Sequence, residues 1–187
     1  MLTLISYLNS IHPLPDQLQD YLTANLRSIH LPKKGFLLQP GQTCRNIYFI
    51  KTGFMHRFRD GSKNDITLYF AGENQIVYSA ESFFQQKPAD ESLQAIEPTD
   101  LLYLSYRQLF YIIGRYAEFA AVFITIIGHY QVARDNNDYA LRCGSVKERY
   151  KHLLVHQPAI VQRAPNKLLA LYLHCSPVYL SYIKKRI

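Results

Sequence analysis

The residues best suited to bind another molecule through charge lie at the C-terminal end of the sequence. The stretch "HCSPVYLSYIKKRI", residues 174–187, places Lys184, Lys185 and Arg186 on the last turn of a short amphipathic helix. Residues 133–187 contain ten Lys and Arg but three Asp and Glu, whereas residues 1–132 contain eleven of each, so the net charge of +7 lies in the C-terminal part. Such an excess is expected where a protein neutralises nucleic-acid phosphates, and a solvated charged surface is the alternative.

Metal and catalytic chemistry is less well supported by residue spacing. His152 and His156 have the i, i+4 spacing of a metal-binding pair, but no glutamate of an HExxH motif lies between them. Cys44, Cys143 and Cys175 are isolated from one another and match no zinc or iron–sulfur pattern. The sequence also contains no glycine-rich phosphate loop and no GxSxG motif. We therefore expect neither an enzyme nor a metal or haem cofactor.

The composition indicates a folded protein without a membrane segment. The chain has 187 residues, of which 48% are hydrophobic, which is enough for a packed core. Its longest apolar stretch, residues 119–128, is far shorter than the about 20 residues that a bilayer span requires. We expect a cytoplasmic protein that does not associate with a membrane.

The spacing of apolar residues changes twice along the chain, and these changes divide it into the segments that position the basic C-terminal part. Residues 2–10 and 15–27 have helical spacing, but between Ile29 and Leu104 short apolar runs alternate with glycine-containing turns. This pattern predicts short antiparallel strands, and Asp60-Gly61 within "RDGSKND" suits a hairpin tip. Helical spacing returns after Ser105, in residues 106–116 and 116–141. The predicted class is α+β, an antiparallel, jelly-roll-like barrel or sandwich with flanking helices.

Apolar residues on the long helix recur at alternating steps of three and four, which is the spacing of a heptad seam. The seam contains Tyr116, Phe119, Phe123, Ile126, Tyr130, Ala133, Asn137 and Ala140. We predict that residues 116–142 pair with the same helix of a second copy. The predicted homodimer interface comprises Phe119, Phe123, Ile126, Tyr130, Ala133 and Asn137. Packing of the helix on its own barrel would produce the same stripe and is the alternative.

A short joint separates the neutral part of the chain from the basic part. Gly144 suits the left-handed residue that follows a helix, and Ser145 and Glu148 have the spacing of a capping box. We place the boundary between two domains, 1–143 and 144–187, at this joint. Two short helices around "CSP" then form a helix-turn-helix pattern. Its expected inward-facing residues are Leu169, Ala170, Leu173, Val178, Leu180 and Ile183.

The order and spacing of these segments resemble the catabolite-activator/FNR family of bacterial transcription regulators. The resemblance runs from about Leu31 to Ile187. It includes "PKKGFLLQPGQTCRNIYFIKTGFMHRF" for the first barrel strands, "LQAIEPTDLLYLSYRQL" for the end of the barrel, and "KERYKHLL" with "NKLLALYLHCSPVYLSYIKK" beyond the long helix. It implies a cyclic-nucleotide-binding-type barrel, a homodimer through the long helix and a DNA-binding C-terminal domain.

The effector site implied by this resemblance departs from that of members that bind cyclic AMP. Those members use a glutamate for the ribose and an arginine for the cyclic phosphate; alignment puts Ser79 and Ala89 there, with Asp90 and Glu91 adjoining. Two carboxylates would repel a phosphate, so we expect no cyclic AMP binding of the usual kind. The pocket would be empty or take an apolar or cationic small molecule. Its predicted residues are Tyr78, Ser79, Ala89, Asp90, Glu91, Tyr130 and Arg134.

The resemblance also implies which residues meet DNA. Val178 and Tyr182 stand where many members have a base-reading Glu and Arg, and Pro177 replaces another polar contact. Val178 suits packing against a thymine methyl group, and the lysines suit phosphates. The sequence ends before the β-wing that usually follows. The predicted DNA-binding residues are Lys167, Ser176, Pro177, Val178, Tyr179, Ser181, Tyr182, Lys184 and Lys185.

These observations favour a dimeric DNA-binding transcription regulator with an effector-sensing barrel. Its expected partners are double-stranded DNA, a second copy of the chain, RNA polymerase and an unidentified small-molecule effector. The alternative is a signalling module that binds a protein through its barrel or basic end and has lost DNA reading.

Overall fold

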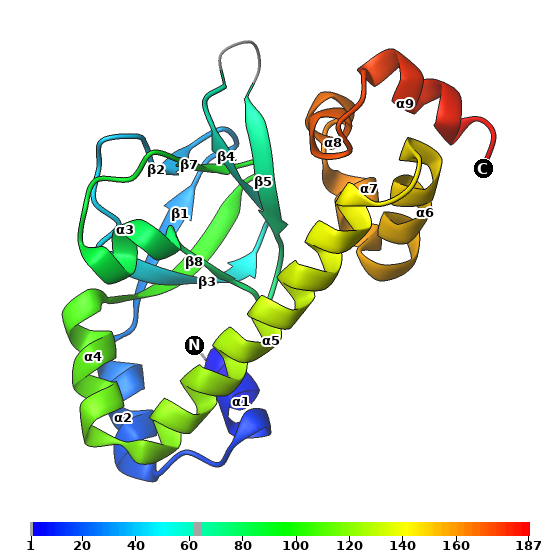
Figure 1. Cartoon of the computed structure of the whole chain (residues 1–187). Coiled ribbons are helices and arrows are strands. Elements are labelled where there is room, and N and C mark those ends of the chain that lie inside the picture. The colour runs from blue at the N-terminus through cyan, green and yellow to red at the C-terminus, as the bar shows by residue number, and fades with distance from the viewer. Residues whose placement is uncertain (1, 62–64) are drawn as a thin grey trace.

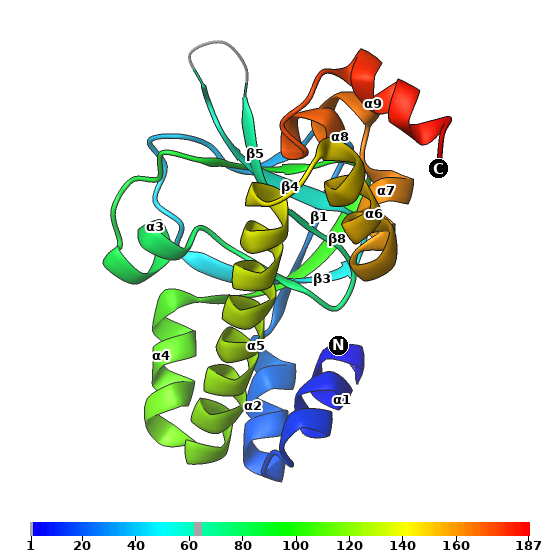
Figure 2. The same ribbon diagram turned by 45° about the vertical axis from the view of Figure 1, so that its right-hand side comes forward.

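The computed structural model describes residues 2–61 and 65–187. Its parts are arranged along one long helix, α5 (Ala117–Arg142), with two antiparallel sheets beside the middle of this helix (Figure 1). Figure 2 shows three helices beside the first half of α5 and the C-terminal helices at its other end. The helices that precede α5 are α1 (Leu2–Ile11), α2 (Asp16–Asn25), α3 (Ala80–Gln85) and α4 (Tyr106–Arg115).

The strands form two four-stranded sheets with the orders β1-β8-β3-β6 and β2-β7-β4-β5. They are β1 (Arg27–Leu31), β2 (Phe36–Leu38), β3 (Asn46–Thr52), β4 (Met55–Arg59), β5 (Ile66–Ala71), β6 (Ile76–Val77), β7 (Ser92–Ala95) and β8 (Thr99–Ser105). Every strand pair is antiparallel, which confirms the predicted α+β class. Among the described residues no ladder between named strands joins the two sheets, so closure into a continuous barrel is not seen.

Three local predictions differ from the structure or are tested in part. The helix predicted over residues 15–27 is α2, which ends at Asn25 because Leu26 is extended and Arg27 pairs with Tyr103 of β8. Sequence periodicity did not reveal β6 and α3, which are shorter than any repeat that it can detect. The strands flanking the predicted hairpin pair as β4 and β5, but part of its tip, residues 62–64, lies outside the described residues.

The turn after β3 requires a glycine. Gly53 has a φ of +107°, and a Cβ at this position would lie 2.6 Å from the Cα of Thr99 and 2.7 Å from the carbonyl oxygen of Pro98. A larger residue would therefore collide with the backbone that enters β8. The Gly53 N–H donates a hydrogen bond to Oε1 of Glu73 at 2.8 Å, so the turn also holds a carboxylate near the outer surface of the sheet.

One hydrophobic core joins the two sheets to the helices around the first half of α5. It contains fully buried residues from each layer, including Leu18 of α2, Ile50 of β3, Leu93 of β7 and Val122 of α5. Burial of this continuous apolar surface is the main stabilising contribution, since it scales with the area removed from water.

The C-terminal helices begin at the predicted joint. Gly144 has a φ of +77°, and Ser145 and Glu148 form the predicted capping box, with the Ser145 N–H donating to Glu148 Oε2 at 2.7 Å. The four helices are α6 (Val146–His156), α7 (Pro158–Arg163), α8 (Asn166–Tyr172) and α9 (Pro177–Lys184). A second hydrophobic core lies among them and also includes Phe54, Phe70 and Ile96 from the sheets.

Candidate nucleic-acid interface and effector cavity

Helices α8 and α9 form a tightly joined pair. Leu169, Ala170, Leu173, Leu180 and Ile183 are buried between the helices as predicted, and the Cys175 N–H donates to the Ala170 carbonyl across the turn at 2.9 Å. His174 takes a φ of +54° in this turn, a conformation that usually favours glycine. The prediction for Val178 as an inward-facing residue is wrong, because it lies in the first turn of α9 and is 80% exposed.

The exposed face of α9 is apolar and aromatic. Tyr179 and Tyr182 are 48% and 47% exposed, and their rings lie nearly parallel, 15° apart, with centroids 6.2 Å from each other. The guanidinium of Arg186 stacks over the Tyr182 ring at 4.0 Å. Together with Val178, these side chains make up the exposed surface of α9, which we call the α9 face.

The polar residues predicted to meet DNA have different roles in the fold. Ser176 caps α9, because its Oγ accepts a hydrogen bond from the Tyr179 N–H at 3.1 Å. Ser181 donates to the Pro177 carbonyl at 2.9 Å. The half-buried Lys184 donates through Nζ to Asn166 Oδ1 at 2.8 Å. Of the residues predicted to meet DNA, Lys184 is half-buried and the exposed ones are Lys167, Ser176, Pro177, Val178, Tyr179, Ser181, Tyr182 and Lys185.

The C-terminal helices are docked on the outer surface of the β4–β5 sheet. Tyr172 of α8 is 2% exposed and meets the Phe70 ring edge-on at a centroid distance of 5.1 Å. Phe70 in turn stacks on Phe54 at 5.7 Å. Aromatic pairs of this geometry contribute beyond their buried area, so the two halves of the chain share one packed interface.

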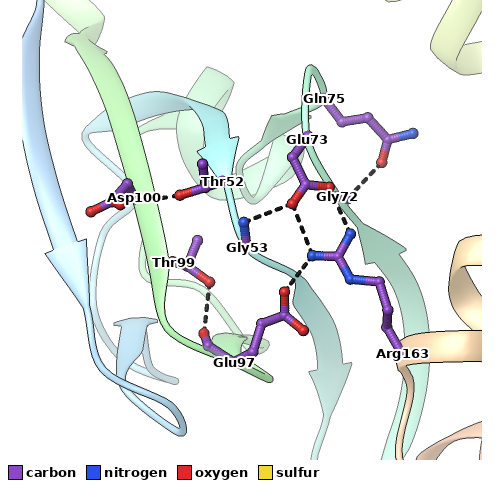
Figure 3. Close-up of polar contacts among 9 residues, drawn as sticks. All are labelled: Thr52, Gly53, Gly72, Glu73, Gln75, Glu97, Thr99, Asp100 and Arg163. Carbon is purple, nitrogen blue, oxygen red and sulfur yellow. Dashed lines mark hydrogen bonds and ion pairs between the residues drawn. The ribbon is translucent and has the colours of Figure 1, made fainter.

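A charged contact, which we call the Arg163 clamp, lies beside this aromatic interface (Figure 3). Arg163 of α7 donates from Nη1 to Glu73 Oε2 at 2.6 Å and from Nη2 to Glu73 Oε1 at 2.9 Å. Its Nη2 also donates to Glu97, and its guanidinium lies 4.7 Å from the centre of the Phe54 ring. The hydrogen bonds from Arg163 lower the pKa of Glu73 to about 2. No spacing pattern in the sequence connects Arg163 with Glu73, because the two residues are far apart along the chain.

A buried polar network links α5 to the C-terminal helices. Asn137 is 8% exposed; its Nδ2 donates to the Tyr172 hydroxyl at 2.7 Å, and its Oδ1 accepts from Gln157 Nε2 at 2.8 Å. Both ends of the amide are therefore satisfied within one chain. This differs from the predicted position of Asn137 on a seam between two copies.

Most of the remaining seam residues also face the protein's own body more than solvent. Phe119 and Ile126 are 5% and 2% exposed in the first core, and the half-buried Phe123 and Tyr130 pack against it. Ala133 is exposed. The packing of the helix on its own barrel, which was the stated alternative, accounts for this stripe in the single chain. A different face of α5 carries the exposed apolar residues Ile124, Val132 and Tyr139, at 70%, 61% and 71% exposure.

A cavity of about 1020 Å³ lies between the sheets, α5 and the C-terminal helices. Three predicted pocket residues line it, namely Tyr78, Tyr130 and Arg134, and four do not, namely Ser79, Ala89, Asp90 and Glu91. Arg57 and Tyr69 of the β4–β5 sheet line it as well, and so do Arg163 and Tyr172. The cavity is therefore lined both by the sheets and by the docked C-terminal helices.

The two carboxylates beside Ala89 do not act as predicted. Glu91 is 5% exposed and lies 3.6 Å from Arg57 Nε, while Asp90 lies 3.0 Å from an Arg59 Nη2 atom. Both are paired with arginines, and neither lines the cavity. The expectation of a cationic ligand, which rested on these two carboxylates, is therefore wrong, because Arg57 lines the cavity and the two carboxylates do not. Arg57 was not predicted to line the cavity, because a single arginine within a strand does not indicate by itself which side chains it faces.

Tyrosine hydroxyls supply much of the cavity's hydrogen-bonding capacity. Burial raises the pKa of Tyr69 to about 12 and also raises the pKa of Tyr78 and Tyr130. These hydroxyls are therefore protonated at neutral pH. The Tyr130 hydroxyl accepts a hydrogen bond from the Ile76 N–H at 2.6 Å, which fixes β6 against α5 and leaves its proton free for donation.

The remaining candidate ligand groups do not assemble into a site. The His152 and His156 rings lie 4.4 Å apart, and desolvation, followed by the neighbouring His156, lowers the pKa of His152. Within residues 2–61 and 65–187, no three His, Cys, Asp or Glu side chains gather as metal ligands do. In the same ranges, none of the helices has the length and hydropathy needed to cross a bilayer.

Comparison with known proteins identifies the class of domain that these sheets form. Residues 28–116 match the family described as cyclic nucleotide-binding domain. No curated protein is significantly similar to the chain in sequence.

Solved structures extend the likeness to nearly the whole chain. The c-di-GMP-responsive global regulator CLP of Xanthomonas campestris is 17% identical, with a TM-score of 0.71 over 92% of this chain and 91% of that one. FixK2 of Bradyrhizobium japonicum is 12% identical, with a TM-score of 0.74 over 86% and 83%. A Crp/Fnr-family regulator of Eubacterium rectale is 15% identical, with a TM-score of 0.71 over 92% and 83%. The chain has the Crp/Fnr fold, which confirms the predicted resemblance.

Proposed function

We propose that the protein is a homodimeric, cytoplasmic, DNA-binding transcription regulator whose cavity holds a small-molecule effector. Helix α9 would enter the major groove, and two copies would contact half-sites about 34 Å apart. RNA polymerase would be a further partner during regulation. Residues 1–143 would sense the effector and residues 144–187 would read DNA, which agrees with the fold that the chain shares with Crp/Fnr regulators.

The observation that carries this proposal is the free surface of α9 in the basic part of the chain. The α9 face is solvent-exposed although it contains three large apolar side chains. Exposed Lys167 and Lys185 lie at the ends of the α8–α9 pair, where cations suit a phosphate backbone on either side of a groove. An isolated α-hairpin with a purely structural role would bury such a face.

Dimerisation is supported by the second face of α5. Ala121, Ile124, Gly128, Val132 and Tyr139 are exposed along the helix at steps of three, four and seven residues. This spacing and the small residues permit close packing of two helices. We propose this face, in place of most of the predicted seam, as the contact between copies.

The effector cavity supports a ligand other than cyclic AMP. No arginine stands at position 89, and Arg57, the nearest equivalent, lies 3.6 Å from the buried Glu91. A cyclic phosphate would have to compete with that carboxylate for the guanidinium. The Tyr69, Tyr78 and Tyr130 side chains instead suit an aromatic or hydroxyl-bearing molecule.

Calorimetric titration tests this view of the cavity. We expect cyclic AMP to produce no saturable heat at micromolar concentrations, because the buried Glu91 beside Arg57 would compete with the phosphate for the guanidinium. Arg57→Gln is expected to leave this result unchanged. Saturable cyclic AMP binding with micromolar affinity that is lost in Arg57→Gln would contradict the proposal.

Duplex binding measured over a series of salt concentrations tests the main function. We expect the logarithm of the affinity to fall linearly with the logarithm of salt concentration, with two chains bound per palindromic duplex. Lys185→Gln is expected to reduce the magnitude of the salt slope by about one, because one phosphate contact is lost.

Lys87→Gln is the matched control, since Lys87 is equally charged and exposed but lies on the sensor side, beyond α3. We expect this variant to bind like the unmodified protein. If the protein binds no duplex at low salt, the alternative of a protein-interaction module replaces the proposal. If Lys87→Gln and Lys185→Gln change the slope equally, α9 is not the DNA-binding element.

A further inference from the structure

The α9 face contains no residue suited to reading a base by paired hydrogen bonds. Bidentate readout of guanine or adenine in the major groove relies on Arg, Lys, Asn or Gln. The exposed positions in the first two turns of α9 are instead occupied by Pro177, Val178, Tyr179, Ser181 and Tyr182. Hydrogen-bond readout of the usual kind is therefore absent from this part of the described structure.

The polar groups nearest to the α9 face are already engaged within the domain. The Asn166 amide donates to the Pro177 carbonyl and to Ser181 Oγ, both at 3.3 Å, and accepts from Lys184. The Ser181 hydroxyl has one proton, and it donates this proton in a hydrogen bond to the Pro177 carbonyl. Donating a hydrogen bond from Asn166 or Ser181 to a base would break an existing hydrogen bond, which costs about as much as the new one supplies.

The position of Arg186 over Tyr182 also does not favour bidentate hydrogen bonds to a base. Its guanidinium carbon lies over the Tyr182 ring, 4.0 Å from the ring centre, and Tyr182 is itself stacked with Tyr179. This arrangement stiffens the aromatic pair and keeps a positive charge at the end of the helix. A charge in that position favours a phosphate on the groove wall, while the apolar side chains face the groove floor.

We infer that α9 specifies its DNA half-site through thymine methyl groups, with Val178 as the principal contact and Tyr182 as the second. This inference rests on the proposed function. The thymine C5-methyl is the apolar group that the major groove offers, and Val and aromatic side chains are its complement. Val178 at 80% exposure and Tyr182 at 47% present the apolar surface for such contacts.

The test begins with the full-length protein and a pool of random duplexes, from which the preferred half-site is enriched. Each thymine of that half-site is then replaced singly by deoxyuridine, which keeps every hydrogen-bonding group of thymine and lacks only the methyl. We expect the affinity to fall about threefold to fivefold for each contacted thymine, the effect of one buried apolar carbon. The salt slope should not change, because no phosphate contact is altered.

Variants of α9 connect the methyl group to the residue. Val178→Ala should weaken binding to the thymine duplex but not to the duplex with deoxyuridine at the contacted position, because the two changes remove the same contact. Val155→Ala is the matched control, since Val155 of α6 is 74% exposed and lies outside α9. We expect it to bind both duplexes like the unmodified protein.

Two results would overturn the inference while leaving the proposed function in place. One is a preferred half-site without thymines, and the other is equal affinity for the thymine duplex and every deoxyuridine duplex, with the palindrome still preferred. A complete lack of duplex binding would overturn the proposed function and the inference together.

Discussion

Replacing Tyr172 with alanine should lower the free energy of unfolding by about 3–5 kcal/mol, the usual range for removing a buried aromatic ring. The ring is 2% exposed and fills the contact between α8 and Phe70. Its removal would leave a cavity between α8 and the sheet. Urea denaturation followed by far-UV circular dichroism at pH 7 measures the effect.

Two companion variants separate the sources of this loss. Tyr172→Phe keeps the ring but leaves the Asn137 Nδ2 donor without its partner, which should cost about 1–3 kcal/mol. Tyr111→Ala is the comparison, because Tyr111 of α4 is 55% exposed and pairs with Tyr21 at 5.4 Å, so its loss should cost at most about 1.5 kcal/mol. A loss of less than about 1 kcal/mol for Tyr172→Ala would mean that the C-terminal helices do not dock on the sheet in solution.

Replacing Arg163 with glutamine should lower the free energy of unfolding by about 2 kcal/mol at pH 7. This value lies between those for exposed and buried ion pairs, because the side chains of Arg163 and Glu73 are 24% and 38% exposed and water screens part of the attraction. The Gln amide can replace one of the guanidinium's hydrogen bonds to Glu73 but not its charge.

The effect of this substitution should depend on pH in a defined direction. Arg163 lowers the pKa of Glu73 from its ordinary value of 4.5 to about 2 in the folded protein. The stability gained from the clamp is therefore complete above pH 4.5 and is lost as the pH falls toward 2. We expect the difference between the unmodified protein and Arg163→Gln to be largest at pH 7 and to shrink steadily below pH 4.5.

Urea denaturation at intervals between pH 7 and pH 3 measures this trend. Arg115→Gln, at the exposed end of α4, removes the same charge away from the clamp and should show no such convergence. If the Arg163→Gln difference stayed constant with pH, Glu73 would not be the partner that makes the contact favourable.

The elements that the sequence predicted correctly are those whose pattern is local. The strand runs that became β3, β5 and β8 repeat over several residues and end at glycines or polar turns. The Ser145–Glu148 capping box depends on two residues three positions apart, and the structure contains it as predicted. Such signals need no knowledge of distant parts of the chain, so they could be read directly.

Predictions of which surface meets which partner were less successful, because an apolar stripe does not identify what covers it. The stripe on α5 indicated a packed face, and in the single chain much of that face is packed against the first core and the C-terminal helices. Phe54 and Phe70 belong to the core shared with the C-terminal helices, and strand alternation alone does not say which side of a sheet another domain will cover. Val178 was predicted both to face inward between the two helices and to contact DNA. Its 80% exposure excludes the first of these positions.

The charged contacts were missed for a related reason. Arg163 and Glu73 are 90 positions apart, and Arg57 lies in β4 while Glu91 directly precedes β7, so no spacing rule connects either pair. Their pairing follows from the way α7 meets the sheet and from the β4–β7 register. Ionic residues within apolar runs are the available signal, and they indicate only that a partner must exist.

The aromatic interface between the sheet and α8 has a thermodynamic consequence for any signal that repositions the C-terminal helices. A swing of these helices about Gly144 would bring the rings of Phe54, Phe70 and Tyr172 into contact with water. Exposing this apolar surface to water costs free energy. A molecule in the neighbouring cavity could produce the movement only if its preference for the moved state exceeded that cost, so a weakly bound molecule could not produce it by itself. The ligand affinity needed to move the helices would then depend on the apolar area of these three rings as well as on the chemistry of the ligand.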